Sequence, residues 1–229
     1  SNRNPKEPLF HFDNRILAYF GCDLYEAALA TELKGEKTFF MPFNQGSNGA
    51  GEVGGAGNPQ RDDDEYVTSY FWKDVLRRDV LLAILQRFIM RQEETTISLI
   101  QDKHGKEKEI SETKTKIIFP RYHQLDVVEK LIRDTEANGS GTNYLIQHSA
   151  GSGKSNSIAW LTYRLASLHN KDNKNIFKGV FVVTDRRVLN RQLQETILGF
   201  EHVDGTVTTI TEDDSNASEK LKDAINAEK

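Results

Sequence analysis

Residues 150–155, Ala-Gly-Ser-Gly-Lys-Ser, have the composition of a loop that holds a triphosphate. Gly151 and Gly153 let successive backbone N–H groups approach phosphate oxygens without an intervening Cβ atom. Lys154 supplies a positive charge for the β- and γ-phosphates, and the Ser155 hydroxyl is placed to bind Mg²⁺. The sequence therefore predicts a nucleotide site that consists of Ala150, Gly151, Ser152, Gly153, Lys154 and Ser155.

The residues on both sides of this loop fit the same chemistry. Residues 143–148 are largely apolar and predict a strand that leads into the loop, and residues 155–169 predict a helix that leaves it. The dipole of such a helix adds partial positive charge where the phosphates would bind. The general phosphate-loop pattern starts with glycine at the position of His148, so the strict pattern fails there. The shorter form that Ala150 opens resembles the loop of superfamily-2 helicases.

A glutamine upstream of the loop is a candidate for binding the base. Gln124 ends the string Arg-Tyr-His-Gln that Arg121 begins, at the place where superfamily-2 helicases carry a glutamine that binds adenine. A side-chain amide both donates and accepts hydrogen bonds, which suits the adenine edge. We therefore expect ATP rather than GTP, with Gln124 and Arg121 among the nucleotide-binding residues. A surface glutamine on an amphipathic helix is the alternative.

A polar cluster follows the next apolar stretch of the chain. Residues 180–183, Val-Phe-Val-Val, precede Thr184, Asp185, Arg186 and Arg187. An acid after an apolar strand can hold Mg²⁺ in phosphoryl transfer, but Glu follows the acid in that motif and Arg186 follows here. The cluster is more similar to a motif that contacts the DNA backbone than to that Mg²⁺-binding motif. We therefore predict phosphate contacts from Thr184, Arg186 and Arg187. Salt-bridged surface arginines are the alternative.

Helices and strands alternate through the second half of the chain. The predicted elements are helix 123–137, strand 143–148, helix 155–169, strand 179–184 and helix 187–198. This alternation is typical of βαβ units and predicts an α/β fold with a parallel sheet. We place the main domain boundary before it, at Phe119-Pro120, which divides the chain into residues 1–118 and 119–229.

The first half predicts a smaller α+β segment. Its predicted elements are a helix over 23–33 capped by Asp23, a strand over 38–43, a helical region over 66–94 and a charged β-hairpin or exposed excursion within 95–118. Apolar residues at spacings of three and four make the region 66–94 the clearest helix of this half. The many Lys and Glu residues of 95–118 indicate a solvated face.

A glycine-rich stretch, residues 45–59, lies between these elements. Gly49, Gly51 and Gly54 match the G-x-G-x-x-G spacing of dinucleotide-binding proteins. That fingerprint works only between a strand and a helix that begins at once, and glycines, a proline and acidic residues follow here. We therefore reject a dinucleotide site and predict a flexible surface loop.

The composition is that of an ordinary globular protein. The chain has 229 residues, of which 37% are apolar and 28% charged, which argues against disorder of the whole chain. A net charge of −4 argues against a protein that coats nucleic acid through bulk electrostatics. The single Cys22 fits a reducing compartment, and no apolar run reaches the roughly 18 residues of a membrane span. We therefore expect a cytoplasmic protein that does not contact membranes and touches DNA only locally.

Several strings of the chain closely resemble the restriction (R) subunit of type I restriction-modification enzymes. In the second half these strings are Phe119 to Asp126, Asn143 to Leu161 and Thr184 to Leu189. In the first half they are Arg3 to Phe10, Thr38 to Asn44 and Gly55 to Pro59. The resemblance covers nearly the whole chain.

The resemblance implies an incomplete RecA-like parallel sheet with flanking helices, preceded by the smaller α+β segment. Residues 119–229 would be the N-terminal half of the first superfamily-2 motor domain. Residues 1–118 would be the C-terminal part of the nuclease domain with its connecting segment. The R subunit of this family uses ATP to pump duplex DNA past a complex with modification (M) and specificity (S) subunits, and then cuts the DNA as an endonuclease.

The resemblance also implies that parts of the complete enzyme lie outside this sequence. The nuclease residues of the family would lie upstream of Arg3, and the Asp-Glu motif that aligns water would lie beyond Lys229. We therefore expect the isolated chain to bind ATP and Mg²⁺ but to show neither nuclease nor efficient ATPase activity. Two alternatives stay open: another superfamily-2 DNA helicase or ATPase, and an interaction module that binds nucleotide without turnover.

Overall fold

The structure of the chain is a computed structural model. It describes residues 4, 6–12, 15–61, 65–101, 107–185, 187–200, 207–211 and 214–226. The chain divides into two compact units, Ser1–His123 and Gln124–Lys229. The fold is mixed α/β, and the sheets of the described part are one of three strands and one of two.

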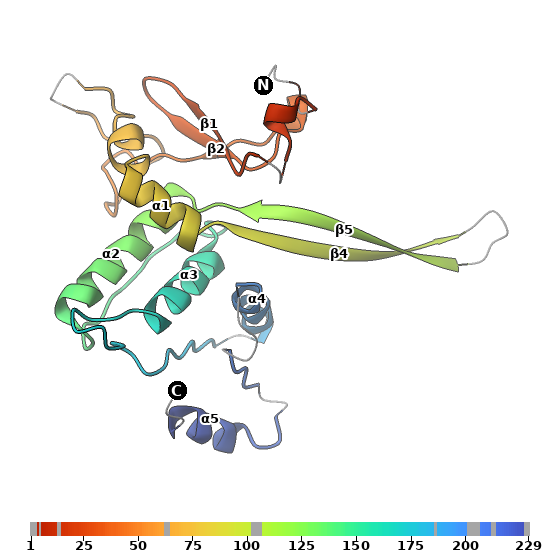
Figure 1. Cartoon of the computed structure of the whole chain (residues 1–229), viewed down its shortest axis with the longest axis vertical. Coiled ribbons are helices and arrows are strands. Elements are labelled where there is room, and N and C mark those ends of the chain that lie inside the picture. Colours follow the sequence, from red (N-terminus) through yellow and green to blue (C-terminus); the bar gives the residue numbers. More distant parts are fainter. Residues whose placement is uncertain are drawn as a thin grey trace. The chain divides into compact units, whose positions relative to one another are not determined.

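A small antiparallel sheet lies in the first unit (Figure 1). It consists of β1 (Tyr19–Cys22), β2 (Ala27–Ala30) and β3 (Met41–Pro42), in the order β1-β2-β3. Tyr19 lies opposite Ala30, and Leu29 lies opposite Met41. Leu29 and Ala30 are buried, so the central strand supplies side chains to the core. The same unit contains the 3-10 helices η1 (Pro8–Phe10) and η2 (Gly35–Lys37).

The turn between β1 and β2 corrects the helix predicted over residues 23–33. The Asp23 Oδ1 atom accepts hydrogen bonds from the backbone N–H groups of Tyr25 and Glu26, both at 2.8 Å, and these bonds lower the pKa of Asp23. An aspartate that closes a turn in this way shares its sequence signature with a helix N-cap. The pairing of β2 on both of its edges decides for the strand. The strand predicted over 38–43 is confirmed only as the short β3.

Aromatic rings form the core of the first unit. The centroid of the Phe20 ring lies 4.8 Å from that of Phe71 and 5.5 Å from that of Phe119. Phe43 is fully buried and packs edge-on against Phe20 at 5.2 Å. The Tyr70 hydroxyl donates to the Phe43 backbone oxygen at 2.7 Å, and burial raises the pKa of Tyr70 far above its ordinary value. Contacts of this kind bury large apolar areas and favour one packing geometry.

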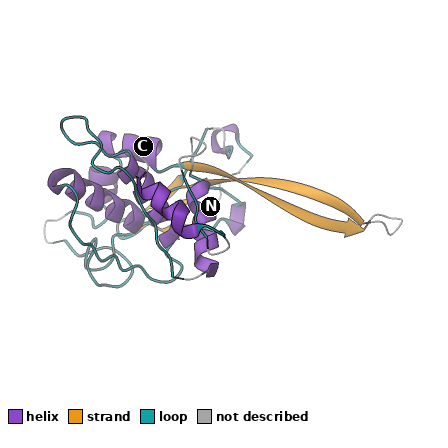
Figure 2. Ribbon diagram, turned by 90° about the horizontal axis from the view of Figure 1, so that it is seen from below, coloured by secondary structure: helices purple, strands orange, loops and turns teal. Residues whose placement is uncertain are grey.

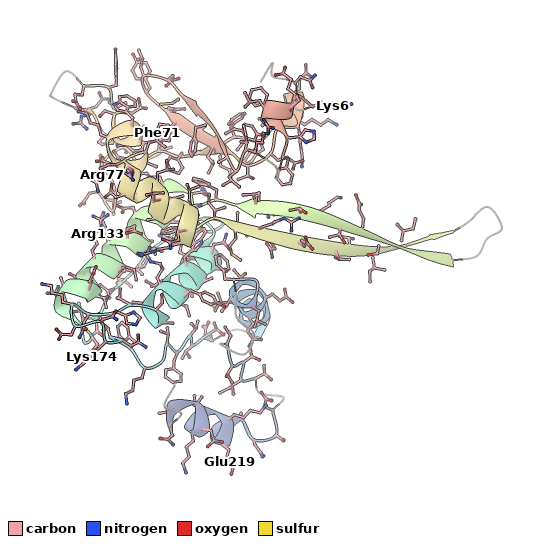
Figure 3. All side chains as sticks on the ribbon, viewed as in Figure 1. Lys6, Phe71, Arg77, Arg133, Lys174 and Glu219 are labelled. Carbon is pink, nitrogen blue, oxygen red and sulfur yellow. The ribbon has the colours of Figure 1, made fainter. Side chains whose placement is uncertain are left out.

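The helical region predicted over residues 66–94 is confirmed in its middle and wrong at its end. It contains the π-helix η3 (Phe71–Val75) and the helix α1 (Arg78–Arg87). Figure 3 labels Phe71 in η3 and Arg77 between the two helices. The Arg77 backbone is extended, with ψ at 139°, and its guanidinium binds the Asp79 carboxylate at 2.7 Å. From Met90 onward the chain is a strand, because it pairs with a strand further along the chain.

The β-hairpin predicted within residues 95–118 is confirmed, and it is longer than predicted. β4 (Met90–Gln101) pairs with β5 (Glu107–Ile118) over the whole length of both strands. Figures 1 and 2 show the two strands side by side and twisted about each other. The base of the hairpin is buried at Met90 and Ile117, whereas Ile97 is 66% exposed. The outer part of this ribbon is therefore held by strand pairing more than by burial.

The glycine-rich residues 45–59 form a hydrogen-bonded loop. The Gly46 N–H donates to the Gly57 oxygen at 2.8 Å, and the Ser47 N–H donates to the Gly55 oxygen at 3.0 Å. The next helical element in the described part of the chain is η3, so no helix N-terminus follows the glycines directly. The rejection of a dinucleotide site stays a prediction, as such a site needs that helix. The flexibility of the loop stays a prediction.

The second unit is built from helices. They are α2 (Tyr122–Asn138, which begins two residues before the boundary), α3 (Lys154–Ala166), α4 (Arg187–Leu198) and α5 (Ala217–Asn226). The helices predicted over 123–137, 155–169 and 187–198 are confirmed, although α3 ends earlier than predicted. The helix α5 was not predicted from the sequence. Every helix in the described part of the chain is too short or too polar to cross a membrane.

The parallel sheet predicted for the second half is not found among the described residues. Residues 143–148 and 179–184 are not strands, and both sheets of the structure are antiparallel and lie in the first unit. The side chains of these two segments are largely exposed, with Leu145 at 96% and Val183 at 91%. β-branched and aromatic residues favour extended backbone, but a strand forms only where a neighbour supplies ladder hydrogen bonds. The strand predictions are therefore wrong for the described structure.

Side-chain contacts connect α3 with α2 and α4. The Trp160 ring of α3 lies edge-on to the Phe200 ring at 5.6 Å, just after α4. The Tyr163 hydroxyl donates to the Ile197 backbone oxygen of α4 at 2.9 Å. The Arg164 guanidinium of α3 forms a salt bridge with a carboxylate of α2. These contacts hold α3 against α2 and α4.

Candidate nucleotide-binding site

The predicted phosphate loop is a turn that ends at the N-terminus of α3. Ala150, Gly151 and Ser152 form the turn, Gly153 is the cap residue, and α3 begins at Lys154. Gly151 has φ at 71° and Gly153 has φ at 80°. Both values lie in the left-handed region, which glycine adopts without steric cost. The loop therefore needs glycine at the two positions where the sequence has it.

Lys154 and Ser155 are the first two residues of α3. The first N–H groups of a helix have no partner within it, and the helix dipole adds partial positive charge there. The Lys154 side chain is exposed, and Ser155 is half-buried. Mg²⁺ takes few protein ligands and keeps water and phosphate oxygens in its shell, so one serine hydroxyl beside an ammonium and amide donors fits it. These residues fit the predicted ATP and Mg²⁺, and the role of Ser155 as the protein ligand of the metal stays a prediction.

The Lys154 ammonium lies against the start of the loop. Its Nζ atom donates to the His148 backbone oxygen at 3.0 Å and to the Ser149 backbone oxygen at 3.4 Å. The pKa of the half-buried His148 is lowered, because burial disfavours its charged form and Lys154 repels it. His148 stands where the general pattern has glycine. A triphosphate would attract Lys154 away from two neutral carbonyls, since a charged acceptor binds the ammonium more strongly.

The structure brings Gln124 of α2 to the same loop. Its side chain is 2% exposed, and its Nε2 atom donates to the Gly153 oxygen at 2.9 Å and to the Ser152 oxygen at 3.3 Å. The alternative of a surface glutamine is therefore wrong for this residue. The predicted contact of Gln124 with adenine stays a prediction. Arg121 lies immediately before α2 in the first unit, and its role in nucleotide binding also stays a prediction.

An ion pair that was not predicted from the sequence connects α2 with α3. The Arg164 guanidinium of α3 pairs with the Glu129 carboxylate of α2, and their side chains are 8% and 17% exposed. The two residues are 35 positions apart. In sequence each of them resembles an ordinary surface charge on a helix, so no local pattern signals the pair. It becomes visible only when α2 packs against α3.

The residues predicted to contact DNA phosphates are only partly described. Thr184 is half-buried, in a segment outside any sheet. Arg186 lies outside the described residues, and Arg187 begins α4 with a side chain that lies outside them too. The role of all three residues in DNA binding stays a prediction.

Comparison with known proteins points to the half of the chain that holds the loop. No curated protein and no solved structure gives a significant match. The family model of the SWI2/SNF2 ATPases matches residues 123–229, a range that includes Gln124, the loop and α3. This match supports a superfamily-2 ATPase motor region, with use of ATP, in the second half of the chain.

Proposed function

We propose that residues 119–229 bind Mg-ATP at the loop 150–155 and form the front half of an ATP-driven DNA motor domain with a RecA-like fold. The observation that carries this proposal is the left-handed Gly153 directly before Lys154 and Ser155 at the N-terminus of α3. The family match over the same half of the chain supports it independently. Each residue type here serves the binding of a triphosphate.

The residues of the loop have separate tasks in this proposal. The backbone N–H groups of the loop and the Lys154 ammonium bind the phosphates, and Ser155 holds Mg²⁺. The metal ion supplies positive charge that neutralises the triphosphate during phosphoryl transfer. Gln124 and Arg121 complete the nucleotide site at the start of α2.

We further propose that the chain is part of the R subunit of a type I restriction system. The strings that resemble this family run through both halves of the chain and support the assignment. Residues 1–118 are then the end of the nuclease domain with its connecting segment. Duplex DNA, contacted by Thr184, Arg186 and Arg187, and the M and S subunits are the expected partners in the cytoplasm.

Calorimetric titration of the 229-residue chain with ATP and Mg²⁺ tests the nucleotide site. We expect saturable binding that Lys154→Ala abolishes, because the variant loses the ammonium that binds the β- and γ-phosphates. Lys174→Ala is the matched control, since it removes an exposed lysine of the same unit, labelled in Figure 3, and should bind as the unchanged chain does. Equal affinity of Lys154→Ala and the unchanged chain contradicts the site.

DNA-stimulated ATP hydrolysis separates a motor from an interaction module. We expect the isolated chain to bind ATP with negligible turnover and a complete R subunit that contains it to hydrolyse ATP in response to duplex DNA. Steady-state phosphate release by the isolated chain at the rate of a complete motor contradicts the first expectation. Nucleotide binding without DNA-stimulated turnover in the complete subunit favours the module.

A further inference from the structure

The side-chain amide of Gln124 is buried and forms hydrogen bonds with the phosphate loop. A side chain with 2% exposure cannot satisfy its N–H groups with bulk water, and leaving them unpaired would be costly. An amide nitrogen carries two hydrogens, and the two acceptors of Nε2 are the backbone oxygens of Ser152 and Gly153. Gln124 therefore connects α2 to two consecutive peptide groups of the loop.

The fit between Gln124 and Gly153 is close. A Cβ atom on Gly153 would lie 2.5 Å from Nε2 of Gln124 and 3.6 Å from its Cδ atom. On Gly151, by contrast, a Cβ atom would meet open space. Glycine is thus required at Gly153 for two reasons, the left-handed backbone and the approach of the amide, whereas backbone conformation alone requires it at Gly151.

The two hydrogen bonds also set the direction of the loop amides. In a planar trans peptide, the C=O group and the N–H group of the next residue point in opposite directions. Holding the oxygens of Ser152 and Gly153 toward Gln124 therefore turns the N–H groups of Gly153 and Lys154 away from it. These are amides that a triphosphate in the proposed site would bind.

The Gly153 oxygen also belongs to the start of α3. It accepts hydrogen bonds from the backbone N–H groups of Asn156 at 3.1 Å and of Ser157 at 3.3 Å. Gln124 and the first turn of α3 thus share one acceptor. A change at Gln124 is transmitted directly to the helix end on which the phosphate site is built.

We infer that Gln124 is a positioning residue. Its hydrogen bonds hold the phosphate loop in place and orient the backbone N–H groups of the loop toward the triphosphate, whatever base the nucleotide carries. This inference rests on the proposed nucleotide site and assigns the residue a task that differs from base recognition. The two tasks compete, because both N–H groups of the amide are engaged with the loop. To donate these N–H groups to an adenine base, Gln124 would have to give up its hydrogen bonds to the loop.

Binding of inorganic tripolyphosphate, which has no base, separates the two tasks. Gln124→Met keeps the length of the side chain and removes its donors without adding charge. We expect it to weaken Mg-tripolyphosphate binding about tenfold and Mg-ATP binding by the same factor, the loss expected from one or two neutral hydrogen bonds. If the affinity for tripolyphosphate is unchanged and only the affinity for ATP falls, Gln124 recognises the base, and the inference is overturned.

Gln147→Met is the matched control for this experiment. It makes the same chemical change at an exposed glutamine shortly before the loop, and we expect unchanged affinity for both ligands. Thermal unfolding of each variant shows whether it is folded. Gln124→Leu serves as the second variant, because it also removes both donors without adding charge, and we expect weaker tripolyphosphate binding from it too.

Amide hydrogen exchange tests, without any ligand, whether the hydrogen bonds of Gln124 hold the loop in place. We expect exchange at Asn156 and Ser157 to accelerate about tenfold in Gln124→Met, because the loop and the first turn of α3 open more often. Unchanged exchange rates at these two amides would contradict the inference that Gln124 holds the loop. If the unchanged chain binds neither tripolyphosphate nor ATP, the proposed nucleotide site fails, and the exchange experiment still decides whether Gln124 holds the loop.

Discussion

The short strands of the first unit contain fewer β-forming residues than two segments of the second unit that are not strands. β1, β2 and β3 are short and antiparallel, and each finds its neighbour within a short stretch of chain. Residues 143–148 and 179–184 contain more β-forming residues than these three strands, and they are not strands. A turn can bring an antiparallel partner alongside, whereas parallel partners need a crossover and a sheet that gathers distant segments. Locality of the partner separates the two outcomes more than composition does.

Burial follows the same division. Leu29 of β2 and Phe43, which follows β3, are 0% exposed, whereas Leu145 is 96% and Val183 is 91% exposed. An apolar side chain contributes to stability in proportion to the area that it removes from water. The first unit therefore gains free energy from its apolar residues, and these two segments of the second unit gain very little.

Truncation of one apolar residue in each region gives the largest expected contrast. Phe43→Ala should destabilise the chain by about 3–5 kcal/mol, because it empties the centre of the aromatic core. Leu145→Ala should change the free energy of unfolding by less than about 0.5 kcal/mol, because the side chain is exposed. Denaturant unfolding, followed by near-ultraviolet circular dichroism, measures both. A cost above about 1 kcal/mol for Leu145→Ala would show that a partner covers the segment 143–148.

The same contrast explains which elements could be predicted from sequence. The helices 122–138, 154–166 and 187–198 were predictable because their apolar periodicity and their bounds are local properties. The hairpin was predictable over residues 95–118 for the same reason, since its partner strands are adjacent in the chain, whereas residues 90–94 were wrongly predicted as helix. The helix expected over 23–33 failed because Asp23 caps a turn with the signature of a helix cap.

The candidate site divides in the same way. Gly151, Gly153, Lys154 and Ser155 could be found from their spacing, because a phosphate loop is one continuous stretch of chain. The hydrogen bonds of Gln124 to that loop could not be read from sequence, because they depend on how α2 packs on α3. From the sequence, Gln124 was expected to contact the base of a nucleotide bound at the loop. The structure adds a direct contact of Gln124 with the loop backbone.

Hydroxyl deletions give the second contrast, at a smaller scale. Tyr70→Phe should cost about 1–3 kcal/mol, because the buried Phe43 oxygen loses its donor. Tyr144→Phe removes an exposed hydroxyl that binds the Asp134 carboxylate, and we expect a change within about 0.5 kcal/mol, since water replaces the donor. Equal costs for the two variants in denaturant unfolding would mean that residue 144 is as well buried as residue 70.

The outer part of the β4–β5 ribbon lies between these extremes. The Thr95 and Thr113 hydroxyls lie 3.1 Å apart on one face of the ribbon, in a directly opposed cross-strand pair. Thr113→Ala should destabilise the ribbon by about 0.2–1 kcal/mol, the usual worth of such a pair. Hydrogen exchange at β4 amides near Thr95 measures it, with Thr96→Ala, on the opposite face of β4, as the control. No change in exchange for Thr113→Ala, or an equal change for both variants, argues against a contribution from the pair.

The pH dependence of His148 is the smallest effect that we predict, and it belongs to the second unit. Burial and then the Lys154 charge hold its folded pKa below the ordinary histidine value of about 6.5. As pH falls below that value, the unfolded chain takes up the proton before the folded chain does, so stability declines until the lowered pKa is passed. The Asp23 carboxylate of the first unit, whose pKa is also lowered, keeps its stabilising contribution throughout this range, because its own loss begins only near pH 4.

Proton NMR titration of the His148 ring checks this prediction and its cause. The midpoint should lie below that of a histidine in a short peptide, and Lys154→Ala should move it upward, because one of the two causes of the shift is removed. Mg-tripolyphosphate should also move it upward in the unchanged chain, since anionic phosphates at the loop favour the protonated ring. A midpoint that ignores both changes would mean that His148 does not experience the charge of Lys154, and the geometry at the start of the loop would then be different from the one described.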